Sequence, residues 1–256
     1  MRNNKTKDKL RRGETVIGTW LDELRSPAVA QLFAAAGLDF LIVDMEHGPY
    51  NLETMADIVR MARQVEITPI VRVPDLTWER IGRSLDAGAQ GLMLPRVQSP
   101  AEVETFVSYL KYPPAGRRGM ASGLGNTDFQ WVTTEDYINF INDEILVLVQ
   151  IETLAAAANA EALASVPGVD VLFIGPDDLS IAMGLPGQSK HPRVAQTIDD
   201  IVAAANRAHV KTGIPCSDPA GLQPLRERGL RFITYGSDVE FLYTAARQGV
   251  EALQAH

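Results

Sequence analysis

Residues Ile70–Leu94, IVRVPDLTWERIGRSLDAGAQGLML, contain the unit from which the fold can be predicted. A short apolar run, Ile70–Val73, is followed by a segment with a 3.6-residue apolar period, Trp78–Ala87, which is typical of a helix. Gly88 stands where glycine commonly ends a helix, and a second apolar run begins at Gly91. Continuously apolar runs are typical of parallel strands covered on both faces. The stretch therefore predicts a strand, a helix and a second parallel strand.

The same unit recurs along the whole chain. Further strands are predicted at Val16–Trp20, Phe40–Val43, Leu146–Ile151, Val171–Ile174, Lys211–Ile214 and Phe232–Thr234. Helices are predicted between them at Pro27–Ala36, Leu52–Gln64, Ala101–Leu110, Leu154–Ala164, Ala195–Ala208, Gly221–Arg228 and Val239–Leu253. No linker separates these units, so we predict one single-domain (β/α)8 TIM barrel over residues 1–256. A doubly wound open sheet is the alternative.

The composition excludes several classes of protein. The 256 residues include 24 Lys and Arg and 32 Asp and Glu, a net charge of −8, which argues against nucleic-acid and membrane-surface binding. A single cysteine, Cys216, excludes an internal disulfide and a Cys-based zinc site. The basic N-terminal extension, residues 1–12, lacks the apolar stretch of a secretory signal, and no apolar run is long enough for a membrane helix. We therefore expect a cytoplasmic protein.

The connection after Gly91–Leu94 is longer than its neighbours. It includes the long loop of residues 112–128, YPPAGRRGMASGLGNTD, which is rich in Gly and Pro and contains Arg117 and Arg118. Loops of this length within a compact domain are usually functional or mobile. Two interpretations stay open: a surface loop, or a lid or subunit contact near the mouth of the barrel.

Polar residues at the carboxyl ends of the predicted strands indicate a metal site, because catalytic groups of such barrels lie there. Gln150 and Glu152 are two residues apart and share one face of their strand, and Asp178 follows the next strand. Two carboxylates at adjacent strand ends suit Mg²⁺ or Mn²⁺, with waters or substrate oxygens as further ligands. The alternative is that Glu152 pairs with Arg72 or Arg96 and that Asp178 caps the following turn.

A histidine and an arginine complete this group of polar residues. His47 follows Asp44 and Glu46, and neighbouring carboxylates raise the basicity of a histidine. Arg72 lies in a buried strand, where a guanidinium needs an anionic partner. Lys211 begins its strand at the opposite end of the barrel, which disfavours a Schiff-base lysine and leaves a metal to stabilise a carbanion.

Six segments, in this order, resemble the HpcH/HpaI family of metal-dependent pyruvate aldolases: VDMEHGPY, PIVRVP, DAGAQGLMLPRV, YPPAGRRG, VQIET and FIGPDDLS. The resemblance extends from Gly13 to about Asp238. It implies a (β/α)8 barrel that binds Mg²⁺, Mn²⁺ or Co²⁺. It also implies a homo-oligomer, typically a hexamer, in which the last helix packs against a neighbouring subunit.

The resemblance also implies roles for individual residues. Glu152 and Asp178 would be metal ligands, and Gln150, Gly175 and the backbone of Asp177 would contact the bound oxo-acid. His47 would be the base, Arg72 the cation at the enolate oxygen, Asp86 the acid that raises the basicity of the histidine, and Asp44 a supporting residue. Asp177 replaces a small neutral residue common in the family, and an inward-pointing carboxylate would alter metal affinity or substrate range. The barrel places Asp86 at the bottom face, so either a neighbouring subunit supplies it or its helix ends earlier.

The implied reaction is the reversible cleavage of a 4-hydroxy-2-oxo acid to pyruvate and an aldehyde through a pyruvate enolate. The substrates of this reaction are small molecules, and the sequence does not identify the aldehyde. Two other functions stay open: an oxaloacetate decarboxylase or related enolate-forming lyase, and a non-catalytic binding protein for 2-oxo acids. His47 counts against the binding protein, because binding alone needs no base.

Overall fold

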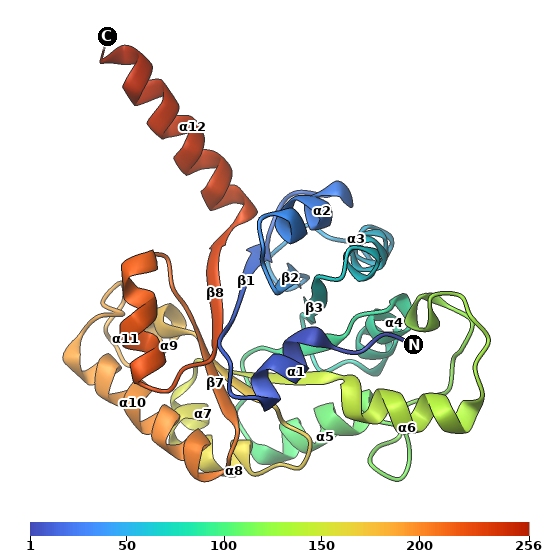
Figure 1. Cartoon of the computed structure of the whole chain (residues 1–256). Helices are drawn as coiled ribbons and strands as arrows, with labels where there is room; N and C mark the ends of the chain where they lie inside the picture. The colour runs from blue at the N-terminus through green and yellow to red at the C-terminus, as the bar shows by residue number, and fades with distance from the viewer. Residues whose placement is uncertain (256) are drawn as a thin grey trace.

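Parallel strands pair in chain order and close into a barrel in residues 1–255, the part of the chain that this computed structural model describes (Figure 1). The strands are β1 (Val16–Leu21), β2 (Phe40–Asp44), β3 (Thr68–Arg72), β4 (Gly91–Leu94), β5 (Leu146–Ile151), β6 (Val171–Ile174), β7 (Lys211–Pro215) and β8 (Phe232–Ser237). Pairing of β8 with β1 closes the ring. The predicted (β/α)8 barrel is therefore confirmed, and the doubly wound sheet was the wrong alternative.

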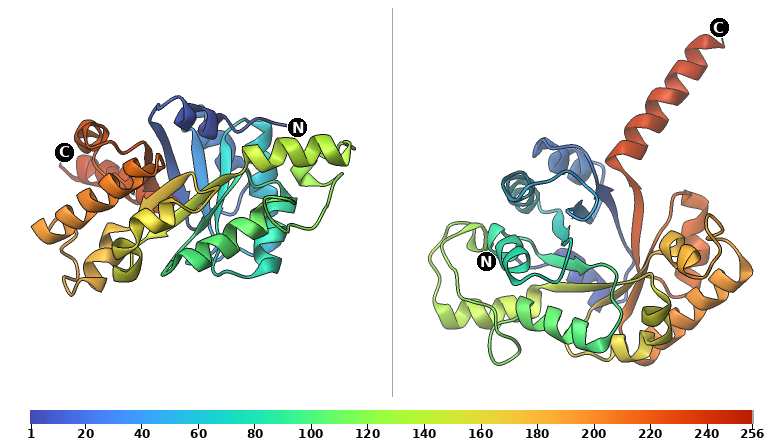
Figure 2. Two further views of the ribbon diagram at one scale, coloured as in Figure 1. Left: turned by 90° about the horizontal axis from the view of Figure 1, so that it is seen from below. Right: turned by 180° about the vertical axis from the view of Figure 1, so that it is seen from behind.

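Helices surround the strands, as both further views show (Figure 2). They are α1 (Lys5–Arg11), α2 (Ala28–Ala35), α3 (Leu52–Gln64), α4 (Trp78–Ala87), α5 (Pro100–Leu110), α6 (Thr134–Glu144), α7 (Leu154–Ala158), α8 (Ala160–Ala164), α9 (Pro176–Ala182), α10 (Pro192–Arg207), α11 (Leu222–Glu227) and α12 (Asp238–Gln254), with short 3₁₀ turns η1 (Gly125–Thr127) and η2 (Pro219–Gly221). The predicted helix Leu154–Ala164 is two helices, because the backbone at Asn159 leaves helical geometry. The sequence patterns missed α1, α6 and α9.

The strands separate two apolar cores. Inside the barrel, alternate strand residues such as Phe40, Ile70 and Phe173 pack together, and the rings of Phe40 and Phe232 stack 4.0 Å apart. The opposite faces of the strands pack against the surrounding helices. The interior is therefore filled with side chains up to the layer at which the strands end.

The predicted N-terminal extension, residues 1–12, contains α1, which closes the bottom of the barrel. Leu10 of α1 is 3% exposed and belongs to the interior core. Lys7 Nζ donates to Asp170 Oδ2 at 2.9 Å and to the carbonyl oxygen of Ile145 at 2.8 Å, so α1 is held at the start of β5 and before β6.

The helix α12 continues from β8 away from the barrel, and it projects from the body in Figure 1 and in the right view of Figure 2. Asp238 is its buried residue. Its large exposed apolar side chains recur at helical spacing and form one stripe: Val239, Leu242, Tyr243, Val250 and Leu253. No helix within residues 1–255 combines the length and the apolar character needed to cross a membrane.

We predict that Lys7→Ala lowers the free energy of unfolding by about 2 kcal/mol, because it removes two hydrogen bonds of a buried ammonium. Urea unfolding followed by circular dichroism measures the change. Lys5→Ala is the matched control on α1: Lys5 pairs with Glu66 where both side chains are 60% exposed, so it should change stability by no more than about 0.5 kcal/mol. Equal losses in the two variants would contradict the role of Lys7.

Candidate active site

The carboxyl ends of the strands surround an open cavity of about 410 Å³. The structure brings most of the predicted site residues together along its wall: Asp44, His47, Arg72, Gln150, Gly175, Asp177 and Asp178. Trp20 and Phe173 lie between them with their rings edge to face, 5.8 Å apart. None of residues 112–128 lines the cavity in the described chain, so within one subunit the long loop does not cover the mouth.

Glu152 lies buried beside the cavity, fixed by two hydrogen bonds. Its Oε1 accepts from the backbone N–H of Arg96 at 2.7 Å, and its Oε2 accepts from Gln150 Nε2 at 2.5 Å. Burial raises the pKa of Glu152, and the charge of Asp178 acts in the same direction, whereas the amide of Arg96 lowers it. The carboxylate is therefore short of positive charge, which a bound cation would supply.

Two further observations show that the space beside Glu152 fits a ligand. The Oε1 atom of Gln150 is buried and makes no hydrogen bond within residues 1–255. A Cβ atom on Gly175 would lie 2.9 Å from Glu152 Oε2, and since the φ of Gly175 is −97°, it is space rather than backbone conformation that requires glycine here. No group of three or more potential His, Cys, Asp or Glu ligands occurs in the described residues. A hard cation held by the two predicted ligands, Glu152 and Asp178, would have to take its other ligands from water or substrate.

Arg72 is held at the cavity wall by two carboxylates. Its Nε donates to Asp44 Oδ1 at 2.9 Å, Nη2 donates to Asp44 Oδ2, and Nη1 lies 3.3 Å from Glu46 Oε2. Burial would lower the pKa of Arg72, but the hydrogen bonds and charges of these partners raise it. Its guanidinium also lies over the Trp20 ring, 4.5 Å from the centroid. Arg72 is therefore a permanently charged group in one fixed position.

His47 lies on a turn that Asp44 also fixes. Asp44 Oδ1 accepts from the backbone N–H of Glu46 at 2.9 Å and of His47 at 3.3 Å. The imidazole is 60% exposed, and its Nε2 lies 3.9 Å from Glu46 Oε2. One carboxylate thus sets the positions of both the arginine and the histidine, while the imidazole remains accessible to a substrate.

Asp86 lies outside this cavity. Its Oδ1 accepts from Arg118 Nη2 at 2.8 Å, next to the long loop. The helix α4 ends at Ala87 as predicted, so an earlier helix end does not bring Asp86 to His47. Its assignment to the site stays a prediction that requires a neighbouring subunit.

Sequence reasoning missed two acidic groups that organise the mouth. Glu46 bridges Arg72 and Arg96, whose Nε lies 2.9 Å from Glu46 Oε1. Asp238 accepts the backbone N–H groups of Asp22, Glu23 and Leu24. The sequence signal that could have identified Asp238 is its position directly after β8, the strand that pairs with β1.

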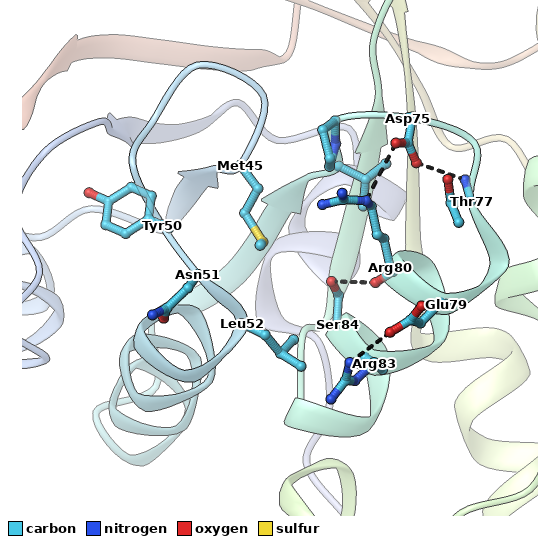
Figure 3. Close-up of a pocket in the computed structure, with 12 residues that line it drawn as sticks. Met45, Tyr50, Asn51, Leu52, Asp75, Thr77, Glu79, Arg80, Arg83 and Ser84 are labelled. Carbon is cyan, nitrogen blue, oxygen red and sulfur yellow. Dashed lines mark hydrogen bonds and ion pairs between the residues drawn. The ribbon is translucent and has the colours of Figure 1, made fainter.

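A second cavity, of about 390 Å³, lies between the starts of α3 and α4, outside the barrel mouth (Figure 3). Its charged side chains are paired with one another: Arg80 with Asp75 at 3.4 Å and Arg83 with Glu79 at 2.7 Å. None of the site residues predicted from the sequence lines it in the described chain. Its composition therefore gives no reason to place the chemistry there.

Comparisons with known proteins agree over nearly the whole chain. A family model described as HpcH/HpaI aldolase/citrate lyase matches residues 17–245. A hydroxypyruvate/pyruvate aldolase of Pseudomonas aeruginosa is 37% identical over 96% of this chain and 91% of its own. A 4-hydroxy-2-oxo-heptane-1,7-dioate aldolase of Salmonella paratyphi A is 37% identical over 98% and 94%. The crystal structure of an HpcH/HpaI aldolase from Desulfitobacterium hafniense DCB-2 has a TM-score of 0.94 at 35% identity and covers 97% of this chain and 96% of its own.

We predict that Gly175→Ala weakens the binding of Mn²⁺ at least about tenfold, because its methyl group would occupy space beside Glu152. Titration calorimetry with Mn²⁺ measures the affinity. Gly82→Ala is the matched control, since its added Cβ meets nothing within 4 Å, and it should bind Mn²⁺ like the unchanged protein. Undiminished affinity in a folded Gly175→Ala variant would remove Glu152 from the metal site.

Proposed function

This chain belongs to the HpcH/HpaI aldolase/citrate lyase family, and on that premise we propose that its barrel mouth forms and uses a pyruvate enolate with the residues described above. The protein is a carbon–carbon lyase of the pyruvate aldolase class, and its relatives' activities favour this function over a decarboxylase or a binding protein. One observation carries the proposal: Glu152, a buried carboxylate whose pKa is raised, lies directly beside a cavity that the fixed Arg72 lines.

Glu152 and Asp178 would hold a divalent cation, for which Mg²⁺ and Mn²⁺ suit the oxygen donors best and Co²⁺ is a further choice. When bound, such a cation supplies a Lewis acid for the keto oxygen of pyruvate. The amide of Gln150 orients the carboxylate of Glu152, and its unpaired Oε1 is available to a ligand within the described part of the cavity. Gly175 and the backbone N–H of Asp177 line the position proposed for the carboxylate of the oxo-acid.

Arg72 stabilises the negative charge that develops on the keto oxygen as the enolate forms. Because Asp44 and Glu46 fix the guanidinium before the substrate arrives, little reorganisation is needed during the reaction. Asp44 is therefore a positioning residue, acting through Arg72 and through the turn that carries His47.

His47 is the proposed base. It accepts a proton from the pyruvate methyl group, directly or through a water, and the alkoxide formed from the aldehyde gains a proton. The C3 atom of pyruvate forms one carbon–carbon bond while the aldehyde loses its C=O π bond, so no oxidant or reductant is consumed. Cleavage of a 4-hydroxy-2-oxo acid reverses these steps.

We propose that the enzyme is a homo-oligomer, with a hexamer as the expected form. The apolar stripe of α12 is a surface that a second copy of the chain would cover. The proposed role of Asp86 beside His47 requires such a neighbouring subunit, because Asp86 does not line the cavity of its own chain. We also propose that the enzyme works in the cytoplasm, where its single cysteine, Cys216, remains a thiol.

We predict that the protein exchanges pyruvate methyl protons for deuterium in heavy water only when Mg²⁺ or Mn²⁺ is present, as followed by NMR after EDTA treatment. This measurement needs no aldehyde. Glu152→Gln should lose both Mn²⁺ binding and exchange. Arg72→Lys should keep Mn²⁺ binding and lower the exchange rate about 100-fold, because a single ammonium cannot reproduce the fixed guanidinium.

Arg80→Lys is the matched control for Arg72→Lys, since Arg80 lines the second cavity, and it should exchange at the unchanged rate. Exchange without added metal would contradict the proposed metal site. Full exchange by Arg72→Lys would remove Arg72 from the mechanism.

We predict that the unchanged protein elutes as an oligomer in size-exclusion chromatography with light scattering. The double variant Leu242→Asp, Val250→Asp should elute with a smaller mass, because it places charges within the apolar stripe. Gln248→Asp, on the opposite face of α12, should leave the mass unchanged. A monomeric unchanged protein would contradict the proposed assembly.

A further inference from the structure

The cavity carries an excess of negative charge along its wall. Asp22, Glu23 and Asp177 line it, and none of the three forms an ion pair within residues 1–255. Asp44 is paired with Arg72, and Asp178 would be neutralised by the cation of the proposed function. Arg72 and His47 supply the basic side chains of the lining in the described chain. Three carboxylates of the cavity wall are thus left unpaired by the described residues, where the aldehyde that reacts with the enolate would enter.

The loop that carries two of these carboxylates is held in place. Asp238, 2% exposed, accepts the N–H groups of Asp22 at 2.8 Å, Glu23 at 3.0 Å and Leu24 at 2.6 Å. Trp20, just before them, donates from Nε1 to Thr234 Oγ1 at 3.0 Å. The backbone of Asp22 and Glu23 therefore cannot move away from an incoming anion without breaking these contacts.

Burial raises the pKa of Asp22, and the charges of Asp44 and Asp238 act in the same direction, whereas a hydrogen bond with Ser237 and the charge of Arg72 lower it. Asp22 therefore lies close enough to other carboxylates for their charges to repel one another. An acceptor with a second anionic group would add to that repulsion. Hydroxyl groups, by contrast, can donate hydrogen bonds to these carboxylates. Trp20, Phe173 and Pro215 provide an apolar wall for a short carbon chain.

We propose that the acceptor is an uncharged short aldehyde, hydroxylated beside the carbonyl, and that Asp22, Glu23 and Asp177 exclude aldehydes bearing a carboxylate or phosphate. This proposal rests on the proposed aldolase function, because it concerns the partner of the pyruvate enolate. The aldol step joins pyruvate C3 to the aldehyde carbon, transfers one proton in total from carbon to oxygen, and is the same for both classes of aldehyde. Charge at the far end of the acceptor is therefore what distinguishes them.

The test compares aldehydes of equal carbon number with the Mn²⁺-loaded full chain and pyruvate: glycolaldehyde against glyoxylate, and butanal against succinate semialdehyde. We expect kcat/KM for the neutral member of each pair to be at least about tenfold higher, and the difference to shrink as salt screens the charges. The variants Asp177→Asn and Glu23→Gln should each raise the ratio of anionic to neutral kcat/KM several-fold. Glu104→Gln, on the outer helix α5, is the control and should leave the ratio unchanged.

Equal kcat/KM within each pair, or a ratio that neither variant moves, would overturn the proposal. In that case continued metal-dependent exchange of pyruvate methyl protons would leave the aldolase function standing. Absence of exchange in the same preparation would instead overturn the aldolase function, and this proposal with it.

Discussion

The ion pair between Arg72 and Asp44 is the interaction on which the mouth of the barrel depends. A guanidinium in a buried strand is stable only with a carboxylate beside it, and β2 and β3 place Asp44 directly opposite Arg72 in register. The same carboxylate receives the backbone of the following turn. The cost of burying a charge is thus offset by a contact that also orders the turn carrying His47.

The fold could be predicted where apolar period and glycine punctuation agree, as over Trp78–Ala87 and Gly91–Leu94, whose bounds match the structure. The fold could not be predicted where buried polar side chains hold an element in place through hydrogen bonds. Asn4, at the cap of α1, and Lys7, within it, are buried, and their partners Glu144 and Asp170 lie 140 and 163 residues further along the chain. An apolar pattern carries no signal for such contacts.

For the site, too, residues placed by local sequence patterns could be predicted, and contacts between distant residues could not. The rule that barrel chemistry lies at strand ends predicts one location for Gln150, Glu152 and Asp178, and the structure places Gln150 and Asp178 on the cavity wall with Glu152 buried beside it. The role of Asp238 depends on residues 214 to 216 positions away, which only barrel closure brings together. Glu46 could be seen as a carboxylate in the sequence, but its bridge between Arg72 and Arg96 required the turn geometry.

The hydrogen bonds of Asp238 have a consequence for how such an enzyme can diverge. Asp238 both begins α12 and fixes residues 22–24, so the direction of the projecting helix and the shape of the cavity wall at Asp22 and Glu23 depend on one side chain. A mutation that reorients α12 would shift that carboxylate, and with it the loop. Selection acting on the C-terminal helix is thereby also selection on the loop after β1, and the two segments are expected to change together rather than independently.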